Sequence, residues 1–142
     1  MKNIIILFLG LFFSFNAYTQ ISTDTIISNN NKNLKLKVLY FHVTNRCNTC
    51  ISIEAAVRKT INENFKNELD SGVIDLYIIN CELPENKTIS EKYEAYGATL
   101  ALTKINANKE KTEEITNFAF SKIHNKDAFI TGLKSNIEKY LK

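Results

Sequence analysis

Two cysteines three residues apart give this chain its clearest chemical motif. Cys47 and Cys50 stand where an apolar, strand-like run gives way to a segment with helical spacing. At the start of a helix, unpaired N–H groups and the positive end of the helix dipole favour a thiolate. We therefore predict a thiol–disulfide exchange site in which Cys47 is the attacking sulfur and Cys50 is the resolving sulfur.

The same thiols allow two other interpretations. A structural disulfide is one, although closing so short a loop removes little entropy from the unfolded chain. Soft-metal or metalloid binding is the other, with Cys47, Cys50 and Cys81 as thiolate ligands for an ion such as Zn or Cu(I). Cys81 follows the second expected strand, and parallel strands would bring it to the same sheet edge. It is otherwise a buried free thiol that packs as a small apolar side chain.

Three neighbours are predicted to modulate the thiols. Arg46 places a guanidinium next to Cys47 in the sequence, which would favour its thiolate. His42 would influence the thiols or ligate a metal, or it would simply be hydrogen-bonded in place. Glu54, one turn after Cys50, would accept a proton during exchange, pair with Arg or Lys, or remain a surface carboxylate.

The apolar patterns around the motif predict seven elements in the order β-α-β-α-β-β-α, with a central mixed four-stranded sheet. The strands are expected at residues 34–43, 73–80, 99–105 and 114–120. The helices are expected at residues 50–70, 87–96 and from near 127 to the end, with Asn86 as the N-cap and Gly97 as the stop of the middle one. The first strand–helix–strand unit implies a parallel, right-handed crossover, and the last two strands an antiparallel hairpin.

The first 33 residues are expected to precede this domain. Residues 1–19 have the basic start, apolar run and small-x-small end of an export signal, and the run is too short to span a bilayer. Residues 20–33 are rich in Ser, Thr and Asn and suit a flexible leader, whereas residues 34–142 suit one domain. We expect a periplasmic or secreted protein without stable membrane insertion after cleavage; an uncleaved N-terminal anchor is the alternative.

Charge and composition argue against two classes of function, nucleic-acid binding and the use of a nucleotide cofactor. The 18 Lys and Arg residues are scattered among 15 Asp and Glu, for a net charge of +3, so a nucleic-acid role is not expected. No glycine-rich nucleotide fingerprint occurs, and hence no nicotinamide or flavin cofactor is indicated. The expected partner is a protein disulfide or a membrane-bound electron donor.

Motif and element order together resemble the thioredoxin-like superfamily, over residues 34–142. A narrower resemblance is to small bacterial proteins described as nitrophenyl compound nitroreductase subunits. It rests on Tyr40-Phe41-His42 before Arg46-Cys47-Asn48-Thr49-Cys50, on Glu54, on residues 80–86 and on Tyr93. The resemblance implies a CxxC that opens the first helix, and any nitroreductase activity would need another subunit.

Ala98 is the main departure from thioredoxins, which carry a cis-proline before the third core strand, facing the disulfide. Alignment of that strand puts Ala98 at the proline position. A cis bond before a non-proline residue costs ~2.5 to 4 kcal/mol, so we expect a trans bond here. Substrate docking and the exclusion of metal from the thiols would then differ from the family pattern.

The sequence therefore predicts an exported redox protein that passes electrons to or from a partner protein through Cys47 and Cys50. A soft-metal or metalloid binding protein and a non-catalytic interaction module are the alternatives. Tyr93 and Tyr96, on the second expected helix, would flank the cleft or pack in the core.

Overall fold

A computed structural model describes residues 33–107 and 109–142, so the predicted signal and all but the last residue of the predicted leader lie outside the described residues. The strands are β1 (Leu36–His42), β2 (Ile74–Asn80), β3 (Thr99–Asn106) and β4 (Lys109–Glu114). The helices are α1 (Asn48–Asn64), α2 (Lys66–Asp70), α3 (Lys87–Lys92), α4 (Thr116–Lys122) and α5 (Lys126–Leu141), with a 3-10 turn, η1 (Pro84–Asn86), before α3.

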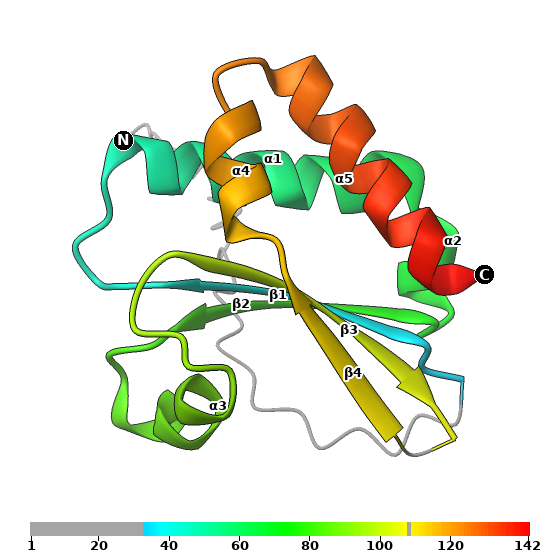
Figure 1. Ribbon diagram of the computed structural model, residues 1–142, viewed down its shortest axis with the longest axis horizontal. Helices are drawn as coiled ribbons and strands as arrows, with labels where there is room; N and C mark the ends of the chain where they lie inside the picture. The colour runs from blue at the N-terminus through cyan, green and yellow to red at the C-terminus, as the bar shows by residue number, and fades with distance from the viewer. Residues whose placement is uncertain (1–32, 108) are drawn as a thin grey trace, which may run out of the picture.

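The four strands form one mixed sheet in the order β2-β1-β3-β4 (Figure 1). β1 runs parallel to β2 and antiparallel to β3, and β3 pairs antiparallel with β4. The predicted mixed α/β class and four-stranded sheet are confirmed. Within residues 33–107 and 109–142, none of the helices has the length and hydropathy needed to cross a bilayer.

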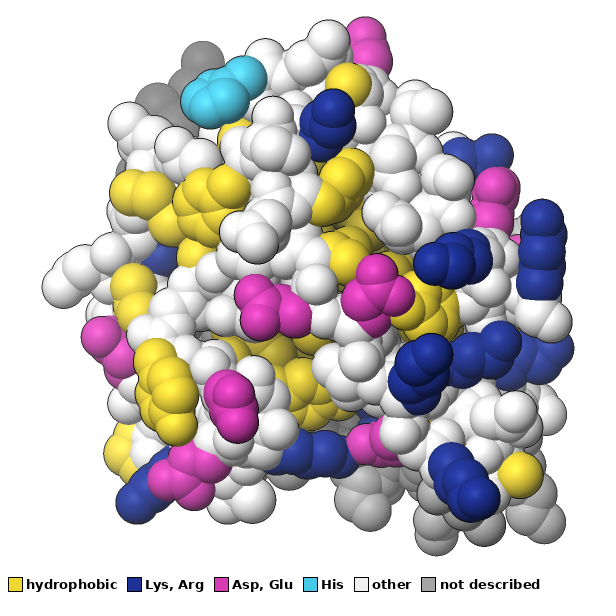
Figure 2. Space-filling view, viewed as in Figure 1, with side chains coloured by type: hydrophobic (Ala, Val, Ile, Leu, Met, Phe, Trp, Pro, Cys, Tyr) yellow, Lys and Arg dark blue, Asp and Glu magenta, His cyan; other side chains and the backbone are white. Residues whose placement is uncertain are grey.

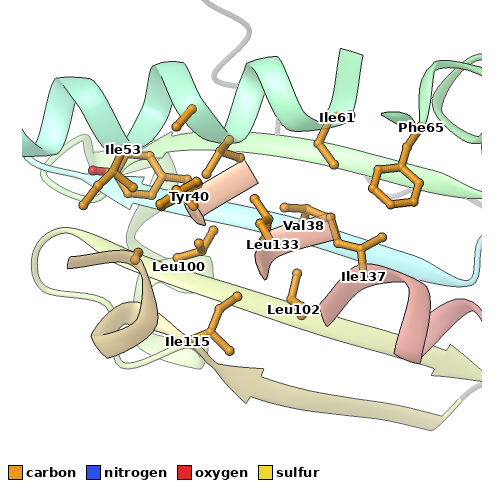
Figure 3. Packing of buried hydrophobic residues seen from close by; sticks show 14 of the residues in the cluster. Val38, Tyr40, Ile53, Ile61, Phe65, Leu100, Leu102, Ile115, Leu133 and Ile137 are labelled. Carbon is orange, nitrogen blue, oxygen red and sulfur yellow. The ribbon is translucent and has the colours of Figure 1, made fainter. Parts of the chain in front are cut away.

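The two faces of the sheet are covered unequally. Helices α1, α4 and α5 lie on one face, and α3 lies on the other (Figure 1). Alternation along β1 sends Val38 and Tyr40 into the larger core, where they meet side chains of α1, β3 and α5 (Figure 3). Leu39 and Phe41 point to the smaller cluster beneath α3. The sheet thereby fixes the carboxyl end of β1, from which the loop to α1 carries Cys47.

The prediction that the last strand lies at residues 114–120 is wrong. Its expected partner β3 is present, but β4 lies earlier and residues 116–122 form α4. Ile115, Ala119 and Ile123 are all buried, and their spacing of four is that of one helix face. All six residues of β4 are exposed, so the strand lacks the apolar alternation that would have marked it.

Two predicted helices have different bounds. The helix expected at residues 50–70 begins at Asn48 and is interrupted at Phe65, whose φ of −135° separates α1 from α2. The helix expected at residues 87–96 ends at Lys92. Asn86 precedes it as predicted but makes no side-chain cap bond; its amide nitrogen donates to the Asn80 carbonyl oxygen at 2.9 Å.

Surface charge on the face that carries β3 and β4 is mixed. Acidic and basic side chains both occur there, with apolar side chains between them (Figure 2). This view agrees with the scattered charges of the sequence.

Candidate thiol site

Cys47 is the N-cap of α1, and Cys50 lies in its first turn. The Cys47 Sγ accepts a hydrogen bond from the Cys50 backbone N–H at 3.3 Å, in the place that a serine or aspartate oxygen takes in other helix caps. The two Sγ atoms are 2.7 Å apart, and both cysteines are free thiols. Cys47 is exposed and Cys50 is half-buried, so a partner's sulfur reaches Cys47 first.

The two thiols of the pair differ in acidity. The pKa of Cys47 is lowered, first by its hydrogen bond with the Cys50 thiol and then by the backbone N–H of Cys50. The pKa of Cys50 is raised, first by burial and then by the hydrogen bond that its thiol donates to the Cys47 sulfur. This asymmetry favours Cys47 as the thiolate and Cys50 as the thiol that keeps its proton.

Arg46 is paired with a carboxylate beside the thiols. Its guanidinium forms an ion pair with Glu54, whereas the largest causes of the lowered pKa of Cys47 are its hydrogen bonds with Cys50. The other carboxylate oxygen of Glu54 accepts from Arg58 Nε at 2.8 Å. Of the three roles considered for Glu54, pairing with arginine is the one that the structure shows. Arg46 therefore ties the loop before Cys47 to the second turn of α1.

Tyr40 lies under the start of α1 and was not predicted as a site residue. Its hydroxyl donates to the Cys50 carbonyl oxygen at 2.9 Å, and the side chain is only 1% exposed. Figure 3 shows the ring below α1, beside Ile53. Burial, and next the charge of Cys50, raise the pKa of Tyr40, so the phenol stays protonated and remains a donor. It holds the first turn of α1 against β1.

His42 and Cys81 meet through the backbone at the carboxyl edge of the sheet. The Cys81 N–H donates to the His42 carbonyl oxygen at 2.8 Å, and His42 Nδ1 donates to the Val43 carbonyl oxygen at 2.9 Å. His42 is thus hydrogen-bonded in place, as one interpretation of the sequence expected. Burial raises the pKa of the Cys81 thiol, which disfavours its thiolate. His124, outside this edge, is exposed.

The three cysteines do not form one ligand group. Among the described residues, no three side chains of His, Cys, Asp or Glu are placed together so that they could hold a metal ion. Cys47 and Cys50 alone are in contact. The sequence correctly places Cys81 after β2, but shared position at a sheet edge does not by itself bring the thiols together.

A polar network joins the two loops at this edge, and sequence reasoning did not assign it a role. The buried Asn80 amide donates to Thr44 Oγ1 at 3.0 Å, and its Oδ1 accepts from the Glu82 N–H at 3.1 Å. The Thr44 N–H donates to the Glu82 carboxylate at 2.9 Å. Hydrogen bonding from the Thr44 side chain, and next from its backbone N–H, lowers the pKa of Glu82. The sequence feature that could have indicated this network is a polar residue, Asn80, at the end of a strongly apolar strand.

Ala98 and the two tyrosines lie around the start of β3. All peptide bonds of the described residues are trans, the one before Ala98 included, and Ala98 packs against the main core. The Tyr93 ring contacts Phe41 in a tilted arrangement with centroids 5.4 Å apart, and its hydroxyl lies 3.0 Å from Thr103 Oγ1, so Tyr93 packs against the smaller core cluster. Tyr96 is 78% exposed.

Comparison with models of protein families and with curated proteins gave no match to this chain. The resemblance to thioredoxin-like proteins therefore remains a prediction from the sequence.

Proposed function

We propose that this protein is a thiol–disulfide redox protein in which Cys47 and Cys50 pass electrons to or from a partner protein. One observation carries the proposal: two adjacent thiols at a helix start have pKa values shifted in opposite directions, with the lowered one exposed. Nucleophile and resolving thiol need this difference. A disulfide kept only for stability does not need it.

The proposed cycle uses the contacts of the site directly. The Cys47 thiolate attacks one sulfur of a partner disulfide, forming a mixed disulfide and releasing the partner's other sulfur as a thiolate. Cys50 then loses its proton and attacks the Cys47 sulfur, which releases the second partner thiolate and leaves a Cys47–Cys50 disulfide. The partner gains two electrons and this protein loses two. A dithiol donor reduces the pair again by the same steps in reverse order.

We further propose a thioredoxin-like fold and export to the periplasm or the medium. The order β2-β1-β3-β4 and a CxxC at the start of α1 support the fold assignment. The basic, apolar and small residues of the first 19 positions support export, and a membrane-bound donor would supply electrons there.

The central experiment combines the trapping of a mixed disulfide with a measurement of the Cys47–Cys50 reduction potential. With Cys50→Ala, Cys47 is expected to remain bound to a protein disulfide as a stable mixed disulfide visible by mass spectrometry, whereas Cys47→Ala forms none. The Cys47–Cys50 reduction potential of the wild type is expected above about −300 mV. A lower potential with no trapped adduct would instead assign the pair a structural role, and metal in anaerobically purified protein would favour the metal-binding alternative.

A further inference from the structure

A mostly apolar groove of about 240 Å³ lies between α1 and α5, directly after the thiols in the sequence. Apolar side chains, one hydroxyl and two amines line it: Ile51, Ala55, Ala56 and Ile130, with Ser52, Lys59 and Lys126. Ile51 follows Cys50 and is 48% exposed, so it offers apolar surface beside the thiols. A partner that covers Ile51 would remove apolar surface from water.

The groove begins one helical turn after Cys47. Ile51, Ala55 and Lys59 line it at a spacing of four, and Cys47 lies four residues before Ile51. Because one turn takes 3.6 residues, each step of four rotates by about 40°, so these residues form a stripe that winds gradually around α1. The Ile51 N–H donates to the Cys47 carbonyl oxygen at 3.1 Å, so the helical register extends to the cap. At a rise of about 1.5 Å per residue, Ile51 lies about 6 Å and Ala55 about 12 Å from Cys47 along the axis.

These distances predict which residues of a bound peptide lie opposite Ile51 and Ala55. An extended chain advances about 3.3 Å per residue, so a peptide whose cysteine is bonded to Cys47 brings residues about two to four positions away to Ile51 and Ala55. A cavity of about 150 Å³ holds benzene in a protein interior, so this larger groove has room for one Leu or Phe side chain. Lys59, about 18 Å along the helix, then faces a residue five or six positions from the cysteine.

We propose that this groove binds the segment next to the partner's reacting cysteine and selects a large apolar side chain, followed by a carboxylate. The inference rests on the proposed redox function and adds the class of substrate. The side chain of Lys59 is 56% exposed, and its ion pair with Glu63 is long at 3.9 Å, so its amine remains accessible to a partner carboxylate. A second copy of this chain fits less well, because its own groove would bring like charges against Lys59 and Lys126.

Exchange rates with three disulfides test this inference. One is a small neutral disulfide, the second a peptide disulfide with Leu three residues and Glu six residues from its cysteine, and the third the same peptide with Ser at both positions. Reduced wild type is expected to react about tenfold faster with the Leu/Glu peptide than with the Ser peptide. Ile51→Ser and Lys59→Glu are each expected to lower this preference, while rates with the small disulfide change less than about twofold.

Matched controls lie away from the groove. Ile105→Ser, at the end of β3 far from Cys47, and Lys111→Glu, on β4, are expected to keep the full preference. Equal wild-type rates for the two peptides would overturn the groove inference while reaction with the small disulfide still supports the redox function. Reaction with none of the three would overturn both. A wild-type dimer that Ile51→Ser separates, measured by sedimentation, would assign the groove to a second copy and overturn the peptide proposal.

Discussion

Cys47 and Cys81 follow neighbouring parallel strands, yet their environments make them different acids. The chain after β1 continues to a helix start, where N–H groups and the Cys50 thiol donate to the Cys47 sulfur. The chain after β2 continues to a 3-10 turn, and Cys81 is half-buried beside Glu82, with a raised pKa. The element that follows the strand, rather than the shared sheet edge, therefore accounts for the opposite directions in which the pKa values of Cys47 and Cys81 are shifted.

Removing each thiol should give the largest contrast. Cys47→Ala is expected to lower the rate of protein disulfide reduction by about 100-fold or more, because the two remaining thiols, Cys50 and Cys81, are less exposed and have raised pKa values. Cys81→Ala is expected to leave that rate within about twofold. An insulin-reduction assay with a dithiol reductant measures both. Comparable losses in the two variants would show that Cys81 shares the chemistry.

The pH dependence of alkylation should separate the same two thiols. A thiolate reacts and a thiol does not, so the rate rises through each group's pKa. The midpoint for Cys47, measured in Cys50→Ser,Cys81→Ala, is expected at or below the ordinary value of about 8.5, since the helix N–H groups remain. The midpoint for Cys81, measured in Cys47→Ala,Cys50→Ala, is expected above it. Iodoacetamide labelling followed by mass spectrometry measures both midpoints. A higher midpoint for Cys47 than for Cys81 would contradict the difference in acidity between the two thiols.

The sequence predicts the elements that carry strong apolar periodicity. β1, β2, β3 and α5 occur near their expected positions because each has a buried face. β4 has none, and its identity depends on pairing with β3, which no local pattern records. The CxxC pair was found because it is local, whereas the Arg46–Glu54 pair and the bond from Tyr40 to Cys50 depend on how loop and helix pack.

The contact between the loops that follow β1 and β2 should depend on Asn80. Asn80→Ala removes a buried amide that bonds Thr44 and Glu82, and it is expected to lower the free energy of unfolding by about 1 to 3 kcal/mol. Urea denaturation measures this loss. Ser90→Ala is the control: the Ser90 Oγ is buried and, among the described residues, has no hydrogen-bond partner, so this change is expected to be neutral or stabilising. Similar losses of unfolding free energy in Asn80→Ala and Ser90→Ala would show that the Asn80 hydrogen bonds do not stabilise the fold.

The smallest expected effect comes from Tyr40, which lies beneath the Cys47–Cys50 pair. Tyr40→Phe removes one hydrogen bond to the Cys50 carbonyl oxygen while keeping the ring, and it should cost about 0.5 to 1.5 kcal/mol of unfolding free energy. Because the bond holds the first turn of α1, the midpoint of Cys47 alkylation should also move toward that of a free thiol. A stability loss with an unchanged midpoint would show that Tyr40 supports the core alone.

β4 also has a consequence for self-association. Five of its six residues are charged, and all six are exposed on a strand that ends the described sheet. In a parallel, in-register stack, each Lys or Glu would face its own copy, and like charges directly opposite each other are destabilising. An antiparallel pairing through the strand centre would still oppose Glu110 to Glu113. Such a strand disfavours cross-β stacking, which protects the protein from amyloid-like aggregation at this edge.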